Sequence, residues 1–166
     1  MIITQRILSR TDRSQLQRLL SRIAEFDQDD QHLALELVDT ALENPDQKDY
    51  YFVLAYDDAN QILGYACYGP TPITDRTFDL YWIAVDPGFA GQGIGSRILK
   101  VVEEKISEVS GRMLVIETSS APRYELTRKF YLKNGYVLAE TLKDFFQEGE
   151  DRVTYLKKFT RSGDPG

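Results

Sequence analysis

The stretch Asp79–Leu99, DLYWIAVDPGFAGQGIGSRIL, decides how this chain folds. An apolar run, Leu80–Val85, leads into the turn residues Asp86-Pro87-Gly88, and three glycines follow at positions 91, 93 and 95. A segment with helical apolar periodicity begins directly at Ile94. Glycines let backbone N–H groups approach an anion closely, and a helix N-terminus adds the positive end of its dipole. The stretch therefore predicts a strand, a phosphate-binding loop and a helix.

Two nucleotide-binding loops are weaker alternatives for this segment. A Walker loop ends in Gly-Lys-Ser/Thr, whereas Gly93 and Gly95 are followed by Ile94 and Ser96. A dinucleotide fingerprint, G-x-G-x-x-G, would need a third glycine where the chain has Ser96. A glycine turn without a ligand explains one or two glycines better than three that alternate.

The same residues resemble the cofactor-binding motif of the GNAT superfamily of N-acetyltransferases. In that family a strand ends in V-x-P, and the pattern Gln/Arg-x-x-Gly-x-Gly/Ala and a helix follow. In this chain Val85-Asp86-Pro87 matches the end of the strand, and Gly93 and Gly95 match the two small positions of the pattern. Ala90 stands where the family usually has Arg or Gln, which removes one side-chain contact. A second element, KFYLKNGY over Lys129–Tyr136, is similar to the family's A-x-x-F-Y-x-x-x-G-F. The resemblance covers about residues 3 to 159.

Apolar periodicity and turn residues indicate a mixed α/β chain. Helices are predicted over residues 12–26, with Thr11 or Asp12 as the cap, and over 30–44, 94–109 and 122–134. Strands are predicted over residues 2–8, 50–56, 61–68, 77–85, 113–117, 136–142 and 153–159. The resemblance implies a twisted, mostly antiparallel sheet of about seven strands flanked by four helices. We expect one domain over residues 1–160 and a disordered tail over 161–166.

Composition excludes several classes of function. The net charge of −6 disfavours non-specific nucleic-acid binding and slightly favours a cationic amine as substrate. A single cysteine, Cys67, excludes a disulfide framework or a cysteine-based metal site, and a lone histidine, His32, gives no metal site either. No apolar run approaches the roughly 18 residues of a membrane helix, and the first residues read as a strand rather than a signal peptide, so we expect a cytoplasmic protein.

The resemblance implies transfer of an acetyl group from acetyl-CoA to a primary amine of a small molecule or peptide by direct attack, by a monomer or homodimer. A lysine-like amine has a pKa near ~10.4, so only about 1 in 2,500 molecules is neutral at pH 7 and a general base is needed. Tyr131 matches the family's tyrosine, whose role would be to protonate or hydrogen-bond the departing thiolate. The alternative is a core aromatic, although Phe130 beside it is the better core candidate.

Two carboxylates are candidates for the general base. Asp79 lies six residues before Val85, and strand alternation places it on one face with Tyr81 and Ile83. Because Asp is shorter than Glu, it would act through a water; the alternative is a solvated carboxylate at the start of a strand. Glu117 closes an otherwise apolar run and is expected to be partly buried.

The resemblance also implies a binding site for the donor. The backbone of Ile83, Ala84 and Val85 would pair with the pantetheine arm. The pyrophosphate would meet the N–H groups of Ala90, Gly91, Gln92, Gly93, Ile94, Gly95 and Ser96. Tyr124 occupies a position where many members have Asn, so Ser119, Ser120 or Tyr124 would replace that contact.

Two questions stay open at this point. The chain could be a CoA-binding sensor without catalysis, which Ala90 slightly favours and Tyr131 disfavours. The acidic and aromatic segment Asp144–Asp151 is either a solvated turn or a loop that flanks the acceptor site.

Overall fold

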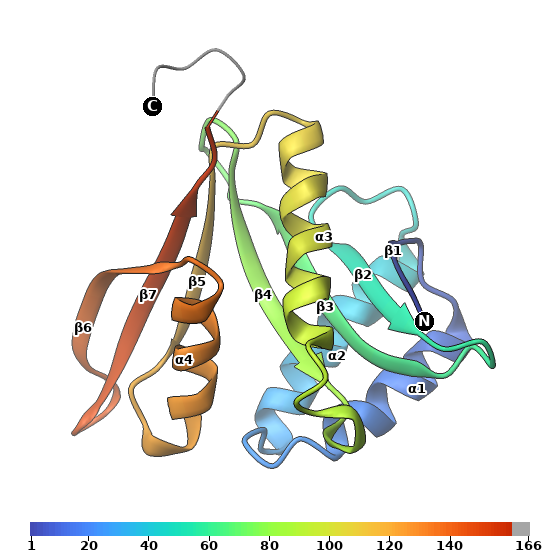
Figure 1. Cartoon of the computed structure of the whole chain (residues 1–166), viewed down its shortest axis with the longest axis horizontal. Coiled ribbons are helices and arrows are strands. Elements are labelled where there is room, and N and C mark those ends of the chain that lie inside the picture. The colour runs from blue at the N-terminus through green and yellow to red at the C-terminus, as the bar shows by residue number, and fades with distance from the viewer. Residues whose placement is uncertain (161–166) are drawn as a thin grey trace. The chain divides into compact units, whose positions relative to one another are not determined.

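The structure, a computed structural model, describes residues 1–160 and contains seven strands and four α-helices in that range (Figure 1). The elements are β1 (Ile2–Gln5), α1 (Arg10–Ser21), α2 (Gln28–Glu43), β2 (Tyr51–Tyr56), β3 (Ile62–Pro70), β4 (Thr77–Val85), α3 (Ile94–Glu108), β5 (Met113–Ser119), α4 (Glu125–Lys133), β6 (Val137–Gln147) and β7 (Glu150–Lys158). Two 3-10 turns, η1 (Pro87–Phe89) and η2 (Pro122–Tyr124), precede α3 and α4. The predicted mixed α/β fold is confirmed, while the expected tail over 161–166 lies outside the described residues.

The strands are hydrogen-bonded in the order β1-β2-β3-β4-β5-β7-β6. Strands β1 and β2, β2 and β3, β5 and β7, and β6 and β7 pair antiparallel. Strands β4 and β5 pair parallel, from Thr77 opposite Met113 to Leu80 opposite Ile116. The chain divides into two compact units, one of residues 1–69 and 82–104 and the other of residues 70–81 and the chain from Lys105 onward. The prediction of one domain over 1–160 stays a prediction.

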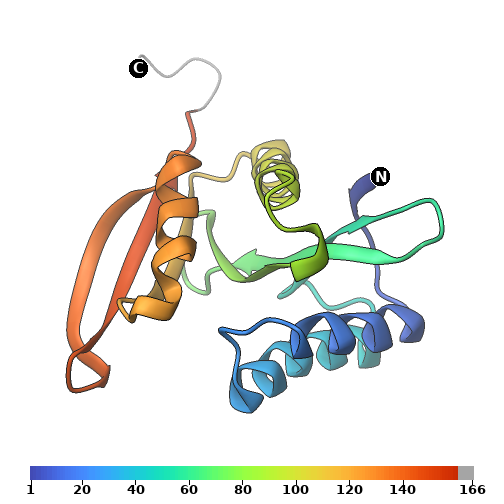
Figure 2. The same ribbon diagram turned by 60° about the horizontal axis from the view of Figure 1, so that its bottom comes forward.

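In the first unit, helices cover both faces of the strands (Figure 2). Helices α1 and α2 lie side by side on one face, and α3 lies on the other. The core contains apolar side chains at helical spacing, among them Leu16 and Leu20 from α1 and Val38 from α2. Gly64 permits a close approach on the α3 side, because a Cβ there would lie 2.9 Å from both the Ala84 carbonyl oxygen and Ile98 Cδ1.

The first two helices begin earlier than predicted, for one physical reason. Ser9 caps α1, since its hydroxyl accepts from the Asp12 N–H and the Asp12 carboxylate accepts from the Ser9 N–H. Asp27 and Asp30 form the same reciprocal pair at the start of α2. Asp12 and Asp30, at which the two helices were predicted to start, are thus the third residues of two capping boxes, and the caps are Ser9 and Asp27.

In the second unit, α4 packs against β7, where the rings of Tyr131 and Tyr155 have centroids 6.0 Å apart. Gly135 ends α4 in the left-handed conformation, with φ +88°, as its predicted C-cap position requires. Helix α4 is shorter than predicted, because Pro122–Tyr124 forms a separate 3-10 turn.

Strands β6 and β7 extend further than predicted and take up most of the segment Asp144–Asp151. The register shifts between Leu142 and Gln147, so Lys143–Phe146 bulges out while pairing resumes at Gln147 opposite Glu150. The sequence of this segment has no alternation of apolar and polar residues, so it gives no sign of strands that continue through a bulge. The interpretation of the segment as a solvated turn is wrong. Every residue of β6 is exposed.

Candidate functional site

The loop between β4 and α3 has a backbone that requires glycine. Gly91 and Gly93 both have φ +75°, a left-handed conformation that side chains with a Cβ disfavour. A Cβ at either position would meet no atom within 4 Å. Glycine is therefore needed here for the backbone conformation and not for packing, and both Cα atoms face open space.

The same loop presents a row of unpaired donors. Among the described residues, the backbone N–H groups of Gly91 through Ser96 have no hydrogen-bond partner, and the first bonded N–H of α3 is that of Arg97, to the Gly93 carbonyl at 3.1 Å. The Ala90 N–H differs from the expectation, because it donates to the Pro87 carbonyl at 3.3 Å inside η1. Unpaired N–H groups at a helix N-terminus form a site for phosphate.

Asp86 builds the turn that starts this loop. Its side chain is buried, with 4% of the residue exposed, and its Oδ1 accepts from the Gly88 N–H at 2.8 Å. Its own N–H donates to the Leu63 carbonyl in β3 at 2.8 Å. The second oxygen, Oδ2, lies 2.6 Å from Nη1 of Arg22 at the end of α1. Sequence reasoning assigned no site role to Asp86 or Arg22; an Asp before Pro-Gly does signal the turn, but nothing local signals Arg22, 64 residues earlier.

Tyr131 is the most buried of the predicted catalytic side chains. Only 5% of the residue is exposed, and its ring contacts those of Phe130, Tyr136 and Tyr155. Burial raises the pKa of the Tyr131 phenol well above its usual range. The expectation that Phe130 is the better core residue is wrong, since Phe130 is only partly buried. Within the described chain the Tyr131 hydroxyl has no hydrogen-bond partner, so a protonated donor is available there.

The two candidate bases have different surroundings. Asp79 is partly buried, and its Oδ2 accepts from the Thr71 hydroxyl at 2.7 Å. The Glu117 side chain is 56% exposed, and its Oε1 lies 4.0 Å from Nη1 of Arg152. Nη2 of the same arginine lies 3.8 Å from Oε1 of Glu140. The expected partial burial of Glu117 is therefore wrong, because β5 continues to Ser119 and the Glu117 side chain lies on its solvent-facing side.

Strand register places these carboxylates on one face of the second unit. Asp79 pairs with Val115, so it shares a face with Glu117, two residues further along β5. Tyr155, which contacts Tyr131, pairs with Ile116 and so faces the opposite side. The candidate bases and Tyr131 thus belong to opposite faces of these strands.

The residues proposed to replace the missing Asn are partly engaged within the protein. The Ser119 hydroxyl donates to Oε1 of the buried Glu150 at 2.6 Å and accepts from the Ala121 N–H at 3.0 Å. The Ser120 hydroxyl accepts from the Asp151 N–H at 2.8 Å. Both hydroxyls therefore help to join the β6–β7 hairpin to the end of β5. Tyr124 is half-buried at the end of η2, below the guanidinium of Arg123.

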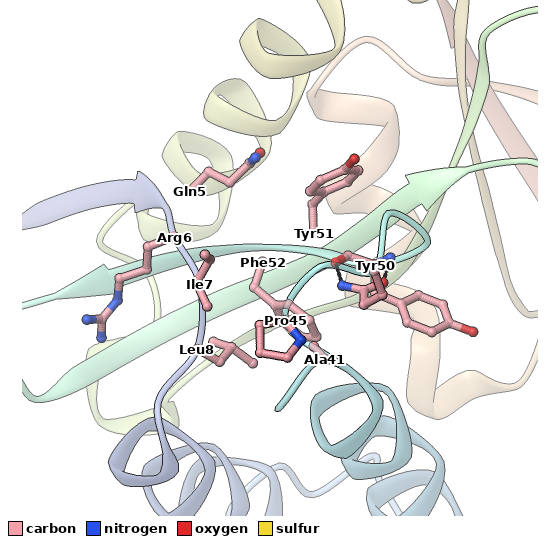
Figure 3. Close-up of a pocket in the computed structure, with 10 residues that line it drawn as sticks. Gln5, Arg6, Ile7, Leu8, Ala41, Pro45, Tyr50, Tyr51 and Phe52 are labelled. Atoms are coloured by element: carbon pink, nitrogen blue, oxygen red, sulfur yellow. Dashed lines mark hydrogen bonds between the residues drawn. The ribbon is translucent and has the colours of Figure 1, made fainter. Parts of the chain in front are cut away.

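A separate pocket of about 330 Å³ lies in the first unit and contains none of the predicted site residues (Figure 3). It is lined by Gln5, Arg6, Ile7, Leu8, Ala41, Pro45, Gln47, Tyr50, Tyr51 and Phe52. The Arg6 side chain points away from the others in Figure 3. The Gln47 amide is used by the loop itself, since it donates to the Tyr50 carbonyl and accepts from the Tyr50 N–H. We assign this pocket no role in the chemistry.

Over residues 1–160 there is no cluster of three or more side chains that could hold a metal ion. None of the helices there is long and apolar enough to cross a membrane.

The comparisons with known proteins agree with this arrangement. The family model "Acetyltransferase (GNAT) domain" matches residues 47–138, which include the loop and Tyr131. A search of curated proteins finds no significant match. A solved GNAT-family protein from Desulfovibrio desulfuricans is 36% identical, with a TM-score of 0.90, over 95% of this chain and 98% of its own.

Two more distant structures share the fold. An aminoglycoside 6'-N-acetyltransferase complexed with coenzyme A is 19% identical, with a TM-score of 0.76, over 99% of this chain and 100% of its own. The ribosomal-protein-S18-alanine N-acetyltransferase from Escherichia coli is 16% identical, with a TM-score of 0.73, over 98% and 97%. By its family-model match and its 36% identical relative, the chain belongs to the GNAT family of acetyltransferases.

Proposed function

We propose that this protein transfers an acetyl group from acetyl-CoA to a primary amine of a small molecule or peptide by direct attack. The observation that carries the proposal is the row of unpaired N–H groups from Gly91 to Ser96 at the start of α3. Their number and position suit a pyrophosphate, which offers several anionic oxygens to one short stretch of backbone. The side chains of this stretch add no positive charge of their own.

The rest of the donor would follow β4. Ile83–Val85 comes after the four residues of β4 that pair with β5, and it leads directly into the phosphate loop. Its backbone would pair with the amides of the pantetheine arm, as an added strand would. Ser119, Ser120 and Tyr124 are the proposed side-chain contacts to that arm, and the two serine hydroxyls can still accept a hydrogen bond while they hold the hairpin.

Tyr131 would act as the general acid and Asp79 as the general base. The Tyr131 phenol is protonated at neutral pH, as an ordinary phenol is, and its hydroxyl would protonate or hydrogen-bond the departing thiolate. Asp79 has one oxygen bonded to Thr71, and the other would accept the amine proton through a water. Glu117 is the alternative base.

The charge of the protein supports a cationic acceptor. The net charge is −6, and Asp79, Glu117 and Glu140 lie on one face of the second unit. Carboxylates attract a protonated amine before it loses its proton. A CoA-binding sensor is the second candidate; the absence of a cation at Ala90 favours it, and a buried, protonated Tyr131 argues for an enzyme.

Ligand-dependent thermal unfolding separates these functions. At about 100 times its dissociation constant, a bound ligand stabilises the folded protein by about 2.7 kcal/mol. We expect acetyl-CoA and CoA to raise the unfolding temperature and NAD and ATP to leave it unchanged. A screen of amines for thiol release from acetyl-CoA then tests catalysis. Stabilisation without thiol release from any amine would favour the sensor, and stabilisation by NAD or ATP alone would contradict both functions.

Gly93→Ala tests the phosphate loop. The added methyl group has free space but the φ of +75° disfavours it, so the loop should relax and lose at least one hydrogen bond to phosphate. We expect CoA to bind about ten- to hundredfold more weakly in calorimetry. Gly149→Ala is the matched control, because Gly149 has φ +82° and equally open surroundings in another turn. Equal CoA affinity in folded Gly93→Ala and wild-type protein would contradict the assignment of this loop.

Tyr131→Phe tests the general acid. Removing the hydroxyl should lower kcat by about 10²–10⁴-fold and leave KM for acetyl-CoA nearly unchanged, since the hydroxyl acts mainly in the transition state. In the wild type, kcat should not fall as pH rises to about 10, because the raised pKa of Tyr131 keeps the phenol protonated there. Wild-type kcat in the variant would show that Tyr131 serves only in packing.

Asp79→Asn and Glu117→Gln test the general base. Each change keeps the size of the side chain but removes its ability to accept a proton. The variant that loses the base should be slow near neutral pH and recover partly at high pH, where more of the amine is already neutral. Glu140→Gln, on the same face and paired with the same Arg152, is the control. Unaltered pH–rate profiles in both test variants would rule out both carboxylates.

A further inference from the structure

The end of α1 contacts the beginning of the phosphate loop through one ion pair. Arg22 is the C-cap residue of α1, and its Nη1 lies 2.6 Å from Oδ2 of Asp86. A Cβ at Gly88 would lie 3.5 Å from Nη2 of Arg22, so the guanidinium lies over the first turn of the loop. Ring contact between Phe26 and Trp82, with centroids 5.4 Å apart, attaches the same α1–α2 connection to β4 at a second point.

The two oxygens of Asp86 have separate partners. Oδ1 accepts from the Gly88 N–H, and Oδ2 bonds Arg22. The main chain of Asp86 is equally fixed, since its N–H donates to Leu63 and its carbonyl accepts from the Phe89 N–H at 2.8 Å. Any movement of this carboxylate therefore moves the start of the loop.

The charge of Asp86 would oppose the ligand if it had no partner. It is a buried carboxylate at the start of a loop whose N–H groups would bind the pyrophosphate under the proposed function, and a buried charge interacts strongly with its neighbours. Residues 86–96 contain no Lys or Arg that could offset it. Arg22 is the cation that contacts this carboxylate. Its side chain is 54% exposed, so the arginine end of the ion pair faces solvent and the aspartate end is buried.

We propose that Arg22 is a positioning residue for the acyl donor: it neutralises Asp86 and fixes it, so that the phosphate loop can accept the pyrophosphate of CoA. The inference rests on the proposed function, because it takes CoA as the ligand of the loop. It predicts that Arg22 affects binding of the phosphate part of CoA and not of the pantetheine part.

The test is a double-mutant cycle on the pair, with CoA affinity measured by calorimetry. Arg22→Gln leaves the buried carboxylate charged, so CoA should bind about ten- to hundredfold more weakly. Adding Asp86→Asn to this variant removes that charge while Asn Oδ1 still accepts from the Gly88 N–H, so most of the affinity should return. Arg22→Lys keeps the charge and should lose less than Arg22→Gln.

The matched control is another Arg–Asp pair of α1. Arg13 lies 2.5 Å from Asp39 of α2, and its side chain also donates to Gln17 of α1. Arg13→Gln should leave the affinity for CoA within about twofold of the wild type, a change below about 0.4 kcal/mol. Pantetheine, which lacks the phosphates, should bind wild-type protein and Arg22→Gln equally well.

Three outcomes would overturn the proposal. They are unchanged CoA affinity in Arg22→Gln, no recovery in the double variant, and an equal loss for CoA and pantetheine, which would show a general structural role. If Arg22→Gln does not fold by circular dichroism, Arg22→Lys and the double variant give the same comparison. Wild-type protein that binds no CoA would refute the proposed function itself, whereas wild-type binding with an insensitive Arg22 would refute only this inference.

Discussion

The buried residue Asp86 connects three parts of the first unit that are distant in sequence. Its carboxylate accepts from Arg22 at the end of α1 and from the Gly88 N–H in the phosphate loop, and its own N–H donates to the Leu63 carbonyl in β3. A buried charge is tolerated only when such partners surround it, so the partners and the charge are mutually dependent. The conformation that leaves six consecutive N–H groups without a partner begins at this residue. The ability of the loop to bind an anion is therefore a property of the whole unit and not of its glycines alone.

Burial holds the Tyr131 hydroxyl among aromatic rings. An exposed phenol would begin to lose its proton near pH 10 and would be solvated by water. Inside a cluster of aromatic rings, burial raises the pKa of the phenol, and among residues 1–160 the hydroxyl has no hydrogen-bond partner, so it stays a donor for a substrate group. The same rings that stabilise α4 against β7 thus hold the hydroxyl in a defined place. Packing and the proposed acid function do not compete at this residue.

The acidic β6–β7 hairpin is joined to the end of β5 by hydrogen bonds. Glu150 is buried beside Ser119, and its second oxygen accepts from the Gln147 amide at 2.8 Å. These bonds attach the hairpin to the end of β5, close to the residues proposed to contact pantetheine. Glu117 and Glu140, in contrast, keep their carboxylates in solvent beside Arg152. The acidic residues near the hairpin therefore divide into buried Glu150, which holds the structure together, and the exposed Glu117 and Glu140, which lie beside Arg152 and can be reached from solvent.

The sequence alone determined the elements whose signal is local. Strand β4, its glycine loop and α3 follow from an apolar run, glycines that permit positive φ and a helical stripe, and Gly135 marks the end of α4 in the same way. Tertiary structure decided what depends on contacts between distant residues: the pairing of Arg22 with Asp86, the burial of Tyr131 rather than Phe130, and the exposure of Glu117. Periodicity indicates that a side chain leaves a strand or helix on a given face, but only the packing of other elements on that face determines whether water or protein surrounds it.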